Sequence, residues 1–485
     1  MGKKGGKKEK LEEKKTVQKE SKNSKKQGAG SSFKCCGIIL TVTAVVVAVA
    51  AYHVYTSVFH IPEMPEVDLD KWWGPNETKE TQDTSVRPFR ILFTDAMQEQ
   101  LVKKFEYHRR LTKPKSFEDT AWTYGVHSQA LAQFFAHWQF KYSYRERQKY
   151  LNQFPHYKTN VQGLDIHFVR VKPEVKNVKV VPIILLHGWP SSFREFYDVI
   201  PLLTTQRPRY DFVFEAIVPS LPGFGYSQAA VRPGLGPFQI AIIMRNLMHR
   251  LGFTQYYIQG GDFGHLIGSI MATLFPNEVL GFHSNMPMTL SKPAFYGTLL
   301  GAIWPTLVEP KYPEKLYPLK EKIEFLIEET GYSHLQATKP DTIGIVLNES
   351  PVGLAAYILD KFMLYTNVNN KYLPDGGITN HYNMTDLIDN VMVYWVTGSI
   401  TSSMRIYKEL LSGVEHTLEQ IPTPVQTWFL NFKNEIFYSP EIFLRWKYPN
   451  LKGMTSHDFG GHFAALERPK DLADDVFLAV KTFIK

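Results

Sequence analysis

One Gly-rich turn places a carboxylate where a nucleophile could stand. The segment Gly260-Gly261-Asp262-Phe263-Gly264 follows a strand-like run, QYYIQGG, and precedes a helix-like run, HLIGSIMATLF. A small-x-nucleophile-x-small sequence between a strand and a helix makes a sharp turn that lifts the central side chain above the sheet. On this motif alone, Asp262 as a nucleophile and a Gly-rich turn whose Asp caps the helix are equally good interpretations.

A second turn, His187-Gly188-Trp189-Pro190, follows the apolar run IILL. When such a turn lies beside a nucleophile, the N–H after the His-Gly pair and the N–H that follows the nucleophile point at the same oxygen. We therefore expect the backbone N–H groups of Trp189 and Phe263 to form an oxyanion hole. A plain strand-to-loop turn would explain this motif alone, but the two motifs together favour the functional interpretation.

A base and an orienting acid are expected later in the chain. His462 stands in the Gly-rich loop GGHF after the last predicted strand, LKGMTSH, whereas His457 lies inside that strand and is a weaker candidate. Glu435 follows the strand-like run PTPVQTWFL, with Glu441 as the fallback. Nucleophile, acid and base then occur in the chain order that a sheet of this kind requires.

An aspartate nucleophile restricts the reaction. Attack by Asp262 on an ester or amide would give a labile anhydride, so acyl hydrolysis is disfavoured, whereas attack on an sp³ carbon gives an alkyl ester on the enzyme. Epoxides and alkyl halides are the two electrophiles of that kind. Water activated by His462, whose imidazole Glu435 holds, would then hydrolyse the ester. This chemistry needs no cofactor and no metal.

Strands and helices must hold these residues in place. From residue 178 onward, the runs VKVVPIILL, FVFEAIVPS and QYYIQGG predict strands separated by helices, which argues for a mostly parallel sheet. Residues 97–108 and 130–148 have the periodicity of helices. Roughly 290–400 is helical and punctuated by prolines, and β signals return at PTPVQTWFL and LKGMTSH. The pattern predicts an α/β fold interrupted by a helical insertion.

The N-terminus differs from the rest of the chain. Residues 1–34 hold twelve Lys and four Glu, which accounts for the whole net charge of +8. A segment so polar should be disordered. Residues 35–55 read CCGIILTVTAVVVAVAAYHVY, and about 20 apolar residues cross the hydrocarbon layer of a bilayer. We expect an uncleaved membrane anchor rather than a signal peptide, because no clear cleavage site ends the run. Cys35 and Cys36 are either acylated or inert thiols.

Composition excludes several classes of protein. Hydrophobic residues make up 44% of the 485, enough to bury a large core. The two cysteines are adjacent, so neither a disulfide framework nor a Cys-based zinc site is available. Outside the tail the chain is neutral, which makes it a poor nucleic-acid binder.

From residue 72 onward the chain resembles the microsomal epoxide hydrolases, and is close also to the insect juvenile hormone epoxide hydrolases. The Lys-rich tail departs from the usual pattern of this family, as does Phe263, where Trp usually follows the nucleophile. The resemblance rests on WWGP (72–75), FPHYKT (154–159), GLDIHF (163–168), HGWPSSFREFY (187–197), YIQGGDFG (257–264), QATKPDT (336–342), SPVGLAAYILDKF (350–362) and GGHFAALERP (460–469).

The resemblance implies an α/β-hydrolase fold with an inserted helical cap and an N-terminal wrapping domain. It also implies that Tyr332 and Tyr407, from the cap, donate protons to the opening epoxide, a role that sequence patterns alone could not assign. The boundaries we expect are 1–34 for the tail, 35–55 for the anchor, 56–165 for the N-terminal domain, 166–289 for the first part of the core, 290–400 for the cap and 401–485 for the second part of the core.

The expected function is hydrolysis of lipophilic epoxides to vicinal diols at a membrane. The alternatives are a haloalkane dehalogenase, against which the missing ring N–H at Phe263 argues, and an inactive lipid binder. The substrate could be a xenobiotic, fatty-acid or terpenoid epoxide. The family implies the endoplasmic reticulum membrane with a cytosolic catalytic domain, whereas the basic tail predicts a lumenal one. Sequons at Asn76, Asn348 and Asn383 would then accept glycans.

Overall fold

The computed structural model describes residues 38, 40–111, 115–411 and 414–484, and the chain forms two compact units, Met1–His60 and Ile61–Lys485. Within the described ranges one helix, Leu40–Phe59, is long and apolar enough to cross a membrane. It runs past the expected boundary at residue 55 and ends shortly before Pro62, because the residue before a proline disfavours helical backbone. The predicted disordered tail and the two cysteines lie outside the described residues.

The second unit is built on one nine-stranded sheet with the order β1-β2-β3-β5-β4-β6-β7-β8-β9. Strands β5, β4, β6, β7, β8 and β9 pair in parallel, and β1, β2 and β3 extend the sheet with antiparallel pairing. The strands are β1 Arg87–Phe89, β2 His156–Val161, β3 Leu164–Val171, β4 Lys179–Leu186, β5 Phe212–Pro219, β6 Tyr256–Gly260, β7 Val279–Ser284, β8 Thr427–Phe432 and β9 Leu451–His457.

The mostly parallel sheet predicted from the sequence is confirmed, and the antiparallel edge is additional. Strands β2 and β3 form a hairpin in which Val161 pairs with Leu164. The two turn residues, Gln162 and Gly163, have φ of 51° and 86°. Positive φ at both central residues matches the twist of the flanking strands, so this short turn fixes the hairpin register. Gln-Gly is a weaker turn signal than Asn-Gly, which explains why the hairpin was not predicted.

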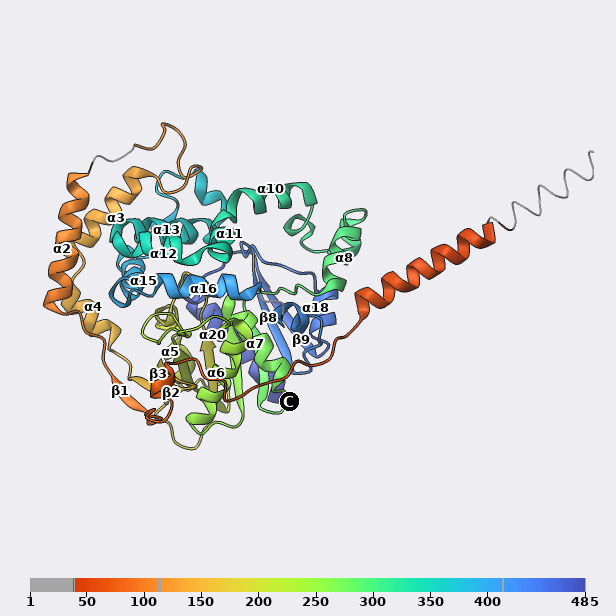
Figure 1. Ribbon diagram of the computed structural model, residues 1–485, viewed down its shortest axis with the longest axis horizontal. Coiled ribbons are helices and arrows are strands. Elements are labelled where there is room, and N and C mark those ends of the chain that lie inside the picture. The colour runs from red at the N-terminus through yellow and green to blue at the C-terminus, as the bar shows by residue number, and fades with distance from the viewer. Residues whose placement is uncertain (1–37, 39, 112–114, 412–413, 485) are drawn as a thin grey trace, which may run out of the picture. The chain divides into compact units, whose positions relative to one another are not determined.

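Helices cover the sheet in two pairs. Helix α6 (Pro237–Arg250) packs against α7 (Phe263–Leu274), and α20 (Pro469–Ile484) packs against α5 (Ile200–Thr204). Figure 1 shows α6 and α7 next to each other in green. The core lies between these helices and the strands, and β5 is buried along its whole length. A strand that is buried on both faces has a nearly continuous apolar sequence, and FVFEAIVP, with Glu215 as its one charged residue, is such a sequence.

The cap is the helical chain between β7 and β8. Several of its helices begin with a proline, among them α12 and α13, because proline has its φ already set for the first helical position. In Figure 1 these helices lie above the strands. The α-helices between β7 and β8 are α8 Lys292–Gly301, α9 Pro305–Val308, α10 Leu319–Glu329, α11 Gly331–Thr338, α12 Pro340–Glu349, α13 Pro351–Thr366, α14 Ile378–His381, α15 Met384–Thr397, α16 Ile400–Leu410 and α17 Val414–Glu419.

The N-terminal part of the second unit packs against the cap. Its helices are α2 (Asp95–Arg110), α3 (Ser128–Phe140) and α4 (Tyr144–Leu151). The helical stretch expected over 130–148 is therefore two helices. The side chain of Ser143 accepts a hydrogen bond from the N–H of Glu146 and so caps the start of the second helix, α4. Arg147 on α4 forms ion pairs with two aspartates of α15, including Asp386 at 3.0 Å. This segment therefore holds α15 from outside the sheet.

Candidate active site

Asp262 stands at the turn between β6 and α7, in a backbone conformation with φ of 51° and ψ of −128°. Positive φ is costly for a residue with a Cβ and is found where surrounding structure enforces it. A Cβ at Gly260 would lie 2.4 Å from the carbonyl oxygen of Gly264, and one at Gly264 would lie 2.0 Å from that of Leu186. Gly260 and Gly264 are therefore required by close backbone approach.

The turn after β4 reaches the same carboxylate. Strands β4 and β6 are parallel neighbours, with Leu186 opposite Gly260, so their ends meet. The backbone N–H of Trp189 donates to Oδ1 of Asp262 at 2.9 Å. A Cβ at Gly188 would lie 2.3 Å from the same oxygen, which explains the glycine in the motif. Phe263 is the first residue of α7, where backbone N–H groups have no partner within the helix.

His462 faces the other oxygen of Asp262. Its Nε2 lies 3.4 Å from Oδ2 of Asp262, and its Nδ1 lies 2.9 Å from Oε2 of Glu435. Both His462 and Glu435 are buried, on the loops that follow β9 and β8. Burial alone would lower the His462 pKa, but the charges of Glu435 and Asp262 and their hydrogen bonds outweigh it and raise this pKa well above its usual value.

The weaker sequence candidates lie elsewhere. His457 ends β9, and its ring stacks on Phe432 and Phe459 with centroids 5.5 and 4.9 Å away. Glu441 pairs with Arg445 one helical turn along, at 2.6 Å. The structure thus brings together Asp262, Glu435 and His462 and leaves both fallback residues out of the cluster.

Two cap tyrosines close the site from above. The rings of Tyr332 on α11 and Tyr407 on α16 lie 6.0 Å apart, and both contact the ring of Trp189, at 5.4 and 5.7 Å. The Tyr407 ring also meets Phe263 edge-on at 4.9 Å. Burial, reinforced by the negative charge of Asp262, raises the pKa of both phenols, so both keep their protons at neutral pH.

Sequence reasoning missed Tyr365. Its hydroxyl donates to the hydroxyl of Tyr332 at 2.7 Å, and its backbone carbonyl accepts from the N–H of His462 at 3.1 Å. Tyr365 therefore joins the cap tyrosines to the loop that carries the histidine. It stands near the end of α13, and nothing in its local sequence distinguishes it from the other cap tyrosines.

A cavity of about 20 Å³ opens beside the carboxylate of Asp262. That volume holds about one water molecule. Polar residues line it together with Asp262 and His462, namely Ser191, Glu195 and Asn285. Glu195 keeps part of its surface accessible, and desolvation raises the pKa of its carboxyl to about 8. Glu195 lies within the segment HGWPSSFREFY, and nothing in its local sequence distinguishes it from a structural or surface acid.

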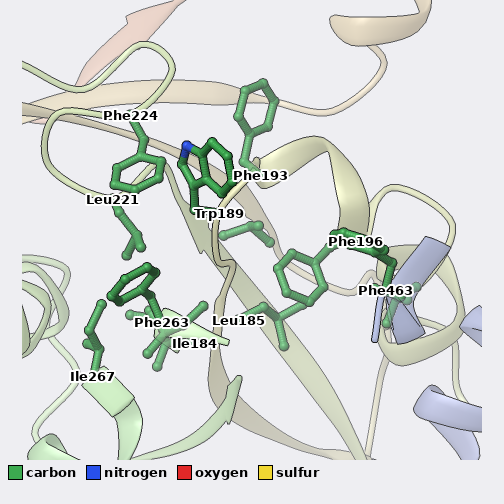
Figure 2. Close-up of a cluster of buried hydrophobic side chains, with 14 of the residues drawn as sticks. Ile184, Leu185, Trp189, Phe193, Phe196, Leu221, Phe224, Phe263, Ile267 and Phe463 are labelled. Carbon is green, nitrogen blue, oxygen red and sulfur yellow. The ribbon is translucent and has the colours of Figure 1, made fainter. Parts of the chain in front are cut away.

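Apolar side chains surround the polar centre. Figure 2 shows Trp189 and Phe263 among Phe193, Leu221 and Phe224, with Ile184 and Leu185 of β4 nearby. These residues are almost fully buried. Electrostatic interactions are stronger in such an environment than in water, which favours fixed N–H donors as stabilisers of developing charge.

A larger cavity, of about 450 Å³, lies between segment 229–235 and helices α12 and α16. Its lining includes none of the candidate catalytic residues.

Comparison with known proteins agrees with this geometry. Residues 86–196 match the family described as epoxide hydrolase N terminus, and 181–311 match the alpha/beta hydrolase fold. The chain is 49% identical over 428 residues to juvenile hormone epoxide hydrolase of Bombyx mori, covering 87% of this chain and 92% of that protein. It is 42% identical over 418 residues to epoxide hydrolase 1 of Oryctolagus cuniculus, covering 84% and 91%.

Solved structures show the same relationship. The crystal structure of the silkworm juvenile hormone epoxide hydrolase aligns with a TM-score of 0.84 at 49% identity, over 86% of this chain and 99% of that one. The Aspergillus niger epoxide hydrolase aligns with a TM-score of 0.67 at 26% identity, over 86% and 100%. With relatives this similar over most of its length, the chain belongs to the epoxide hydrolase family of enzymes with the α/β-hydrolase fold.

Proposed function

We propose that this enzyme hydrolyses lipophilic epoxides to vicinal diols through an ester on Asp262. One observation carries the proposal. A single carboxylate has one oxygen hydrogen-bonded to a backbone N–H at 2.9 Å and the other facing a histidine–glutamate pair, with two phenols above it. The relatives named above are epoxide hydrolases, which supports the same reaction here.

In the first step Asp262 attacks an epoxide carbon. The C–O bond of the ring breaks as the ester C–O bond forms, and the electron pair of the broken bond goes to the ring oxygen. Tyr332 or Tyr407 donates a proton to that oxygen, since an unprotonated alkoxide is a poor leaving group. The raised pKa of both phenols keeps the proton available at neutral pH.

In the second step water attacks the carbonyl carbon of Asp262. We place this water in the small cavity beside the carboxylate, within reach of His462. His462 takes a proton from the water, and the N–H groups of Trp189 and Phe263 stabilise the oxyanion on Asp262. Collapse of this intermediate breaks the ester C–O bond, and the departing diol oxygen takes the proton from His462. The proton of the Asp262 acid that is regenerated returns to the tyrosinate left by the first step, which restores the resting enzyme.

Alkylation should also switch His462 into a base. In the resting enzyme the Asp262 carboxylate helps to raise the His462 pKa. Ester formation removes that negative charge, so the pKa must fall and the imidazole more readily becomes neutral. Glu435, which keeps its charge, then orients the ring and stabilises the imidazolium formed in the next step. The ester is thus formed before the base that removes it is fully active.

Diol formation from styrene oxide is the direct test of the reaction. A parallel assay for halide release from a chloroalkane covers the dehalogenase alternative, and absence of both activities would favour an inactive lipid binder. The 49% identity to the silkworm enzyme makes a juvenile-hormone-type terpenoid epoxide the first physiological substrate to test.

We further propose that helix Leu40–Phe59 anchors the enzyme in the endoplasmic reticulum membrane as a single pass. Lipophilic epoxides partition into bilayers, so an anchored enzyme meets its substrate there. Protease protection in sealed microsomes would decide between a cytosolic and a lumenal catalytic unit.

The three sequons differ in how accessible they are to a glycan. Asn76 and Asn383 are exposed, whereas the Asn348 amide donates to Thr401 at 2.6 Å and is partly buried.

A further inference from the structure

Helix α8 has its small residues facing the protein and its large ones facing outward. On the inner side, a Cβ at Gly297 would meet the ring of Phe443, one at Gly301 would meet the hydroxyl of Tyr317, and Ala294 is buried. A surface helix of a soluble domain has the reverse arrangement, with its apolar side chains inward. This helix therefore presents its apolar face to its surroundings.

The apolar surface continues beyond α8. We call it the α8–α10 patch, and each of its side chains is about half exposed or more. Tyr317, just before α10, donates to the carbonyl of Thr298 at 3.0 Å and so joins the start of α10 to α8. Figure 1 shows α8 and α10 at the outer edge of the cap. The patch consists of Phe295, Tyr296, Leu299, Leu300, Ile303, Trp304, Leu307, Ile323, Leu326 and Ile327.

A group of large apolar side chains left exposed on linked helices marks a site of interaction. A bilayer is favoured as the partner because the same chain carries helix Leu40–Phe59. From Phe59 to Trp73, whose N–H donates to Gln162 within the folded body, the chain has thirteen intervening residues. Fully extended, they span roughly 45 Å at most. A membrane that holds the anchor therefore stays within reach of the catalytic body.

The composition of the patch fits the interface of a bilayer. Trp304 and Tyr296 are of the two aromatic types enriched at the boundary between headgroups and hydrocarbon, and Phe295 adds apolar area. Residues 290–330 contain five Lys and six Glu, so the segment has almost no net charge. Contact with lipid would then rest on apolar area and not on attraction to anionic headgroups.

We propose that helices α8 to α10 form a second contact of this enzyme with the phospholipid bilayer, in which the patch side chains enter the interfacial region. The proposal rests on the membrane anchoring proposed above. Tyr332 is the second residue of α11, which follows α10 directly, so lipid contact would bring the bilayer close to the helix that carries a candidate proton donor. A lipophilic epoxide would be taken up from the bilayer at this side of the cap.

Fluorescence quenching in the full-length protein tests the contact. In a Cys35→Ser, Cys36→Ser background, single cysteines at Leu300, Ile303 or Leu307 carry an environment-sensitive label, and the protein is reconstituted into phosphatidylcholine vesicles containing spin-labelled lipid. We expect quenching at these positions, unchanged by added phosphatidylserine, and none at Tyr124, a control side chain of similar exposure on the N-terminal segment. Equal quenching at Tyr124 or none at the three positions would overturn the proposal.

A label at Val47, within the anchor helix, separates the two proposals. Quenching at Val47 without quenching at the patch would refute the patch alone, and absence of quenching at both would refute the anchor as well. A blue shift that increases with the protein-to-lipid ratio but resists the lipid quencher would show that a second copy of the chain covers the patch, and would also overturn the proposal.

Kinetics supply an independent readout. The triple variant Leu300→Ser, Trp304→Ser, Leu307→Ser should raise the KM for a vesicle-dissolved epoxide several-fold and leave kcat for water-soluble styrene oxide in detergent unchanged. A matched triple, Tyr107→Ser, Tyr124→Ser, Phe140→Ser, removes equally exposed side chains outside the patch and should change neither value. An unchanged KM in the patch variant would contradict uptake from the bilayer.

Discussion

The core half and the cap half of the site are held in place by different means. On the core side, backbone fixes the geometry, since parallel pairing of β4 with β6 brings the turns of Trp189 and Asp262 together and glycines allow the close approach. On the cap side, Tyr332 and Tyr407 lie on separate helices and are placed by ring contacts. Substitution of Asp262 or His462 in the core half should therefore abolish a chemical step, whereas single substitutions of the cap tyrosines should give graded losses.

The largest effect in the cap half is expected from the double variant Tyr332→Phe, Tyr407→Phe. A positioned general acid contributes roughly 10² to 10⁴ in rate, so loss of both donors should slow alkylation by about 10³ or more. Each single variant should lose less, because the other phenol still donates. Stopped-flow measurement of the alkylation burst tests this, and a burst of wild-type rate in the double variant would exclude these tyrosines as donors.

A comparable loss is expected in the core half from Glu435→Gln. The imidazole of His462 stays in place but loses the charge that orients it and stabilises its protonated form, so ester hydrolysis should slow by about 10³ to 10⁴ while alkylation continues. Partial accumulation of the ester under turnover, followed by intact mass, is the readout. The matched variant Glu441→Gln alters an exposed acid of the same region and should behave as wild type.

The two halves should also differ in their response to pH. His462 has a raised pKa in the resting enzyme, and below its pKa it holds a proton and cannot accept one from water. Ester decay should therefore rise with pH, with an apparent pKa below that of the resting histidine. Alkylation should stay level through neutral pH, because the phenols hold their protons. Single-turnover rates across pH measure both steps, and identical profiles would contradict the assignment.

The smallest effect is expected at Tyr365, which contacts both halves. Tyr365→Phe removes the hydroxyl that donates to Tyr332 but keeps the carbonyl that accepts from His462, so alkylation should fall only a few-fold and hydrolysis should not change. Tyr357→Phe on the same helix is the control, since its hydroxyl contacts Gln336 instead. Slower hydrolysis in Tyr365→Phe would contradict this expectation and would show that the cap tyrosines also affect the hydrolytic step.

The same contrast explains what the sequence could predict. The nucleophile turn, the His-Gly turn and the Gly-rich loop of His462 carry local signatures, because backbone geometry demands glycine at set places. Tyr332 and Tyr407 lack such signatures, since helix packing brings them together from positions 75 residues apart, and only family resemblance indicated them. Tyr365 and Glu195 were missed for the same reason. The β2–β3 hairpin was not predicted because its turn, Gln162-Gly163, has an uncommon sequence for a hairpin turn.

The central claim is that an ester forms on Asp262 and that His462 removes it. His462→Gln should still react with an epoxide and then stall, because the attack by the carboxylate does not use the imidazole. The intact protein should gain the mass of one substrate molecule, with the adduct in the peptide that contains Asp262, and Asp262→Ala should show no adduct. Normal turnover by His462→Gln, or an adduct on another peptide, would contradict the account.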